Sequence, residues 1–118
     1  MLTEEQDPTG IDPHTPGAHL DHGKPRAGLV LMSFGNALME VSRVGSFGAE
    51  KYTPRGWLEV ENGVERYLDS AFRHLFKMET EPNDPQSGLS HLSHAAWNLL
   101  ASLELELRGD DTKKRSSR

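Results

Sequence analysis

Apolar residues recur at every third or fourth position in three separate segments of this chain, and no segment has the alternating pattern of a strand. Such spacing places the apolar side chains on one face of a helix, which must then pack against another element. The clearest segment predicts a helix at residues 63–78, and two others predict helices at residues 36–52 and at residues 85 or 87 to 108. The pattern therefore predicts an all-α fold, a bundle of three main helices with a short turn near Trp57.

Local signals predict where these helices begin and end. The segment Thr53-Pro54-Arg55-Gly56 is a clear stop after the first helix. Asp84 followed by Pro85 suits an N-cap with proline at the first helical position, so the third helix is expected to begin there. Gly109 is a natural terminator of the third helix. The main apolar stripe of that helix consists of Leu89, Leu92, Ala96, Leu99, Leu103 and Leu107.

The uneven distribution of apolar residues divides the 118-residue chain into three parts. Residues 1–26, rich in proline and glycine, are expected to form a flexible arm. Residues 27–109 are expected to form a single helical domain, and residues 110–118 a disordered basic tail. A folded part of about 80 residues has a marginal core, and oligomerisation is a common remedy. We therefore expect a homo-oligomer, either a dimer or a tetramer.

Composition excludes several classes of function. A net charge of -5 argues against general nucleic-acid binding, which needs a concentrated basic surface. The chain has no cysteine, which excludes disulfides, thiolate metal sites and cysteine nucleophiles. No apolar run reaches the roughly 18 residues that a membrane span needs, and the polar, acidic start is unlike a secretory signal. We expect a cytoplasmic protein that does not contact membranes.

Common catalytic and nucleotide-binding motifs are missing. The sequence contains neither a GxxxxGK[ST] phosphate loop nor a GxGxxG fingerprint, and it lacks the HExxH pattern of zinc hydrolases. Ser70 and Ser87 are possible partners for a histidine, but neither lies in a nucleophile elbow. Any chemistry must therefore come from a different group of residues.

A polar row on the third predicted helix is the first candidate. His91 and His94 are three residues apart, so both project from one side of the helix, and Asn98 continues the row. Burying such groups without partners costs several kcal/mol. The row therefore consists either of structural histidines bonded to neighbouring groups or of ligands for a metal.

Acidic residues close to this helix favour a metal. Glu81 and Asp84 are three residues apart in the preceding loop, with Glu79 close by, and Glu40 lies at the polar margin of the first predicted helix. Mg²⁺ and Mn²⁺ prefer carboxylate oxygen, and Mn²⁺ also accepts imidazole. Alternatively, Asp84 is only a helix cap and Glu81 a solvated loop acid. Spacing alone leaves open whether these groups converge.

Basic residues in the same region suit phosphate. Arg73 and Lys77 are one turn apart on the second predicted helix, and Lys51 and Arg55 flank the end of the first. Such groups neutralise phosphate charge, and arginine does so with two hydrogen bonds. The alternative is ordinary helix-surface charge. Trp57, in a loop, either stacks on a base or caps the core.

Three blocks of residues, in their order and spacing, resemble one known family. The blocks are Phe47-Gly-Ala-Glu-Lys-Tyr52 with Trp57, then Arg73-His74-Leu75, and then Glu81-Pro-Asn-Asp84-Pro-Gln-Ser-Gly88-Leu-Ser-His91-Leu-Ser-His94-Ala95. They resemble the phage dATP/dGTP diphosphohydrolase family, a MazG-like branch of the all-α nucleotide pyrophosphohydrolases. The resemblance covers residues 24–107, and the third block is its most specific part.

The resemblance implies a reaction and a set of roles. The reaction is hydrolysis of a purine deoxynucleoside triphosphate, dATP or dGTP, to the monophosphate and pyrophosphate, in the host cytoplasm if the chain is phage-encoded. Mg²⁺ or Mn²⁺ would bridge the phosphates and activate a water. The implied catalytic residues and metal ligands are Glu40, Glu81, Asp84 and His91, with His94 as a further ligand or as the partner of one. The implied substrate-binding residues are Lys51, Arg55, Trp57, Arg73 and His74.

One departure from the wider MazG-like pattern leaves the ligand set open. That pattern has an ExxE pair on one helix and an ExxD pair on the next. Glu81 and Asp84 have the ExxD spacing, but they lie in a loop between prolines. Glu40 is followed by Arg43 where a second glutamate would stand. Two other functions also stay open: a helical interaction or accessory module without catalysis, and hydrolysis of a phosphomonoester.

Overall fold

The computed structural model describes residues 5–109, and in this range the chain forms two compact units. The first unit ends at Phe34 and the second begins at Gly35. The predicted basic tail, residues 110–118, lies outside the described residues. The predicted division between an arm and a helical domain after residue 26 stays a prediction.

The first unit consists of turns followed by a short helix, α1 (Ala27–Met32). Its turns are organised by Asp7, whose carboxylate accepts hydrogen bonds from the backbone N–H of Thr9 and of His19. The hydroxyl of Thr9, together with these N–H groups, lowers the pKa of Asp7 to about 2. No described residue of this unit is buried. Local hydrogen bonds rather than a core therefore shape residues 5–34.

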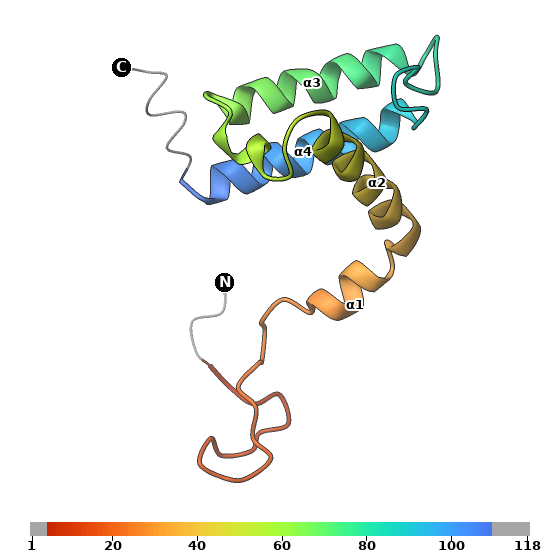
Figure 1. Cartoon of the computed structure of the whole chain (residues 1–118). Coiled ribbons are helices and arrows are strands. Elements are labelled where there is room, and N and C mark those ends of the chain that lie inside the picture. The colour runs from red at the N-terminus through yellow and green to blue at the C-terminus, as the bar shows by residue number, and fades with distance from the viewer. Residues whose placement is uncertain (1–4, 110–118) are drawn as a thin grey trace. The chain divides into compact units, whose positions relative to one another are not determined.

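The second unit contains the three main helices, which confirms the predicted all-α class. They are α2 (Gly35–Lys51), α3 (Gly63–Lys77) and α4 (His91–Leu107), with a 3-10 turn η1 (Gly56–Glu59) at the expected place. The structure has no β-strand within residues 5–109. In Figure 1, α3 and α4 lie alongside each other, and α2 packs against α4. The predicted first and second helices agree with α2 and α3 to within one residue.

The predicted start of the third helix is wrong. The carboxylate of Asp84 does accept the backbone N–H of Gln86 and of Ser87, each at 2.9 Å, but it closes a turn instead of capping a helix. Gly88 then takes a left-handed conformation, with φ of 75°, which interrupts any helix beginning at Pro85. Ser90 is the true N-cap, and its hydroxyl accepts the N–H of Ser93. The polar loop between α3 and α4 is therefore longer than predicted.

The buried face of α4 is made of small and polar residues. Ala95, Ala101 and Leu105 pack there with Ala71 of α3 and Val44 of α2, and these five are the buried apolar residues among the described ones. The Leu105 side chain of α4 lies against the backbone of α3 at Gly63, since a Cβ on Gly63 would lie 2.5 Å from Cδ1 of Leu105. The polar row predicted on this helix faces inward as well: His91, His94 and Asn98 are all buried.

The predicted leucine stripe of α4 lies on the opposite, exposed side of the helix. Leu92, Leu99, Leu103 and Leu107 keep 45–73% of their surface exposed. The helix thus directs its polar row at α3 and α2 and leaves much of its apolar stripe unpacked. Among the described residues, no helix is long and apolar enough to span a lipid bilayer.

Candidate functional site

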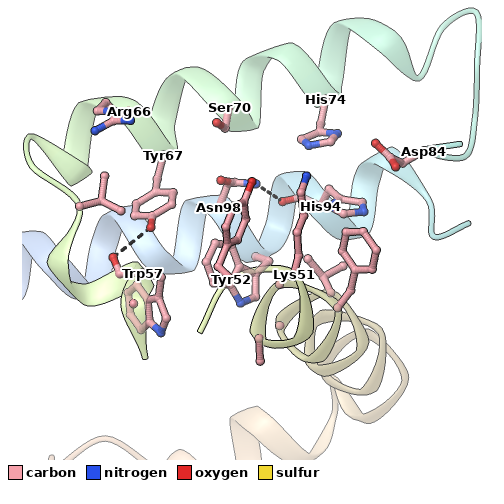
Figure 2. Close-up of a pocket in the computed structure, with 18 of the residues that line it drawn as sticks. Lys51, Tyr52, Trp57, Arg66, Tyr67, Ser70, His74, Asp84, His94 and Asn98 are labelled. Carbon is pink, nitrogen blue, oxygen red and sulfur yellow. Dashed lines mark hydrogen bonds between the residues drawn. The ribbon is translucent and has the colours of Figure 1, made fainter. Parts of the chain in front are cut away.

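The second unit contains a cleft of about 660 Å³ between α2, η1, α3 and α4 (Figure 2). Its lining combines three kinds of side chain: histidine with carboxylate, cationic, and aromatic. These include His74, Asp84 and His94; Lys51, Arg66 and Arg73; and Tyr52, Trp57, Tyr67 and Trp97.

Three side chains at one end of the cleft have the arrangement of metal ligands. His74 comes from the end of α3, Asp84 from the following loop, and His91 from the first turn of α4. One ligand atom from each lies within 4.8 Å of the others, and Nδ1 of His74 is 2.9 Å from Nδ1 of His91. The α3–α4 hairpin therefore brings together groups that lie up to 17 residues apart in the sequence.

The ring of His91 has no exposed surface, and both of its nitrogens have partners. Nε2 lies 3.0 Å from Oε1 of Glu81. Because a carboxylate only accepts, Nε2 carries the hydrogen, and Nδ1 of neutral His91 keeps its lone pair toward His74. In the protein without a cation, Nδ1 of His74 then donates to His91. Glu81 thus sets the tautomer of His91 from the outer side of the ring.

His94 supports the same cluster one turn further along α4. Its ring stacks on that of His74, with centroids 4.6 Å apart and planes inclined by 15°. Nε2 of His94 lies 2.6 Å from the hydroxyl oxygen of Ser87 in the α3–α4 loop. The ring of Phe47 from α2 meets His94 edge-on. His94 therefore joins both helices and the loop around His74.

The surroundings favour the protonation states that bind a cation. Burial lowers the pKa of His74 to about 4, an effect strengthened by His94 and His91 and opposed by Asp84. Burial also lowers the pKa of His94. Burial raises the pKa of Asp84, but hydrogen bonds from the N–H groups of Ser87 and Gln86 lower it more, so the net pKa is below its ordinary value. At neutral pH, His74 is neutral and Asp84 is ionised.

Cationic side chains stand along the cleft. Nζ of Lys51 donates to the side-chain oxygen of Gln86 at 2.9 Å, which ties the end of α2 to the α3–α4 loop. Arg73 donates to the hydroxyl of Ser70 at 2.7 Å, one turn earlier on α3. The partners of both cations are neutral, so their charge stays available for an anion in the cleft.

An aromatic cluster, which we define as Trp57, Tyr67 and Trp97, occupies the other end of the cleft. The three rings meet one another edge to face, with centroids 5.6–6.4 Å apart. The hydroxyl of Tyr67 donates to the backbone carbonyl of Trp57 at 2.9 Å. Burial raises the pKa of Tyr67 to about 12, so this donor stays protonated. Gly45 lets Trp97 approach α2, since a Cβ there would lie 3.1 Å from the indole nitrogen.

The structure places most of the predicted site residues in or beside this cleft. Lys51, Trp57, Arg73, His74, Asp84 and His94 line it, and His91 and Glu81 stand directly behind its histidine end. Two further predicted residues are also absent from its lining. Arg55 is one, and Glu40 is the other, with its carboxylate 2.8 Å from Nη1 of Arg43.

Several lining residues were not predicted as site residues: Arg66, Tyr67, Ser70, Gln86, Trp97 and Asn98. In the sequence, Asn98 stands out only as the continuation of the histidine row. A signal for Asn98 existed in its spacing, since it stands one turn after His94. Trp97 and Tyr67 reach the cleft because α3 packs against α4, and no local sequence pattern predicts that packing.

Comparisons with known proteins identify the family to which the chain is similar. Residues 14–115 match the model of a protein family described as "dATP/dGTP diphosphohydrolase, N-terminal". A "dATP/dGTP diphosphohydrolase" of Salmonella phage PMBT28 is 34% identical over 85 residues, which are 71% of this chain and 28% of that protein. The chain therefore spans little more than a quarter of the length of that relative. No solved structure matches the chain significantly.

Proposed function

Since this chain belongs to the dATP/dGTP diphosphohydrolase family, whose N-terminal region it matches, we propose that it hydrolyses dATP or dGTP to the monophosphate and pyrophosphate with a divalent cation. The observation that carries this proposal is the group of His74, Asp84 and His91 at one end of a cleft that also presents Lys51 and Arg73. A triphosphate needs both a cation and fixed positive charge at the same place.

The geometry of the histidine end suits a cation. Two imidazole nitrogens that would hold one ion must lie close together. Nδ1 of His74 and Nδ1 of His91 are 2.9 Å apart. A ligating histidine usually donates its other N–H to a carboxylate, as Nε2 of His91 does to Glu81. Two imidazoles and one carboxylate suit Mn²⁺ better than Mg²⁺, which prefers oxygen ligands.

Each residue then has a specific task. His74, Asp84 and His91 would hold the cation, which would supply polarisation of the phosphate and activation of a water. Glu81 fixes the ring of His91, and His94 holds the ring of His74 by stacking. In this proposal Glu81 and His94 are positioning residues rather than ligands.

The cationic residues act on the phosphates. Lys51 reaches the cleft from the end of α2, and Arg73 from α3, so the two approach a bound ligand from different elements. Their charge neutralises the triphosphate on binding and stabilises the negative charge that develops on the leaving pyrophosphate. The hydrogen bonds to Gln86 and Ser70 hold both side chains in place beforehand.

Product analysis with an Asp84→Asn variant tests the proposal. We expect the full chain to release pyrophosphate from dATP and dGTP in the presence of Mn²⁺, and the variant to lose about 100-fold or more of this activity. Asparagine keeps the oxygen that accepts the N–H of Gln86 and of Ser87, so the loop is preserved. The control is Glu104→Gln, an exposed carboxylate paired with Arg108.

The other candidate functions give different results. Release of inorganic phosphate instead of pyrophosphate would identify a phosphomonoester or stepwise reaction. An interaction module without catalysis would bind neither Mn²⁺ nor nucleotide in calorimetry, and Asp84→Asn would have no effect on either. Any of these outcomes contradicts the proposed reaction.

A further inference from the structure

We propose that the aromatic cluster and Asn98 form a base-recognition end of the cleft, in which the Asn98 amide reads the amino group of a purine. The inference rests on the proposed function, because it identifies how the same cleft orients its nucleotide. The group of His74, Asp84 and His91 would receive the phosphates, and the base would point the other way along α3 and α4.

The spacing along the helices supports this orientation. Tyr67 and His74 lie seven residues apart on one face of α3, which is two turns or about 10 Å. Asn98 and His91 have the same separation on α4. Figure 2 shows Asn98 opposite Ser70 and Tyr67, and His94 opposite His74. The distance of two helical turns is comparable to that between the phosphates and the base of an extended nucleotide.

Asn98 is a buried amide with unused hydrogen-bonding capacity. Only 7% of the surface of Asn98 is exposed, and its Nδ2 donates a hydrogen bond to the backbone carbonyl of His94 at 2.8 Å. Because a carbonyl oxygen only accepts, the amino group must face it, and the position of Oδ1 is thereby fixed. None of the described residues donates a hydrogen bond to Oδ1. A buried acceptor of this kind normally has a partner, and Asn98 lines the cleft.

The chemistry of the amide indicates which base it would accept. Oδ1 needs an N–H donor, and the second hydrogen of Nδ2 needs an acceptor, which together match the amino group and adjacent ring nitrogen of adenine. Guanine also offers N–H donors to Oδ1. The half-buried rings of Trp57, Tyr67 and Trp97 provide apolar surface for the flat base beside it.

Binding of dAMP and of its analogue without the amino group, deoxynebularine monophosphate, tests the inference. The chain has two tryptophans, and both line the cleft, so intrinsic fluorescence reports occupancy directly. In the full chain without metal, we expect dAMP to bind about tenfold more tightly than the analogue. In Asn98→Ala, we expect the two affinities to become equal. Equal affinities in the unmodified chain would overturn the inference without any variant.

Ser102→Ala is the matched control. Ser102 is also a buried polar residue of α4, one turn beyond Asn98, and its hydroxyl donates to the backbone carbonyl of Val64. It is not part of the cleft lining, so the preference for dAMP should survive its loss. If Ser102→Ala removes the preference as Asn98→Ala does, the effect comes from helix packing and the inference fails.

These measurements separate the inference from the proposed function. Since dAMP has no phosphoanhydride bond, the proposed reaction does not consume it, and a preference that depends on Asn98 would stand even if the chain released no pyrophosphate from dATP. Conversely, dATP could be hydrolysed while Asn98→Ala still binds dAMP more tightly than the analogue. In that case the inference fails, but the proposed reaction stands.

Discussion

His74 is held neutral by its position between α3 and α4. Burial opposes a positive charge on its ring, and the two neighbouring histidines would repel one, although Asp84 partly compensates. The ring lies half-buried against His94 and beside His91, so a charge on it would lose contact with water and lie close to two other imidazoles. Protonating His74 therefore competes with folding.

This predicts a loss of stability in mild acid. The pKa of His74 is about 4 in the folded chain against 6.5 for an ordinary histidine, so between these values the unfolded chain binds more protons. The contribution of His74 is present above pH 6.5 and is lost as the pH falls toward 4. Urea unfolding with a chelator should show stability declining over this window, and declining less in His74→Gln. An identical decline in both proteins would contradict this account of His74.

The helix α4 explains why the interior of this unit is polar. Its inward face carries His91, His94 and Asn98 among small residues, which lets α3 approach closely and brings His74 onto His91. The exposed leucines lie on the other face at spacings of four and seven residues, which is typical of helices that pair. With five apolar residues buried among the described ones, the unit has an apolar face available for a second copy.

We therefore expect the chain to self-associate through the leucine face of α4. Leu103→Asp should shift the mass measured by light scattering toward the monomer, because it would bury a charge in the interface. Leu29→Asp, the same change at an exposed leucine of α1, should leave the mass unchanged. A monomer at all concentrations for the unmodified chain would exclude this assembly.

Elements were easier to predict than their junctions. The three–four rhythm gave α2 and α3 because it depends on local spacing. The predicted start of α4 was wrong because Asp84 before Pro85 has the local chemistry of a helix cap. In the structure, the turn at Gly88 and the bridge between Asn83 and Ser90 keep this segment in a loop, so the helix begins later. That bridge is a pairing across the loop, which a local pattern does not encode.

At the scale of the whole molecule, the cleft lies within residues 44–98, entirely in the second unit. The sequence predicted that His91 and Asp84 would belong to one site, and the structure brings both to His74. The sequence did not predict that Glu40 would pair with Arg43, or that the rings of Trp97 and Tyr67 would be in contact. The pairing of Glu40 with Arg43 lies within α2 at a spacing of three residues, where a local pattern could have indicated it, whereas the contact between Trp97 and Tyr67 depends on how α3 packs against α4.

The central claim is that His74, Asp84 and His91 together hold a divalent cation. Pulsed electron paramagnetic resonance of Mn²⁺ bound to the full chain tests it directly, because coupling to nitrogen nuclei reports imidazole ligands. We predict coupling to two histidine nitrogens, reduced to one in His74→Gln and unchanged in the Glu104→Gln control. Bound Mn²⁺ without nitrogen coupling, or coupling unaffected by His74→Gln, would contradict the account.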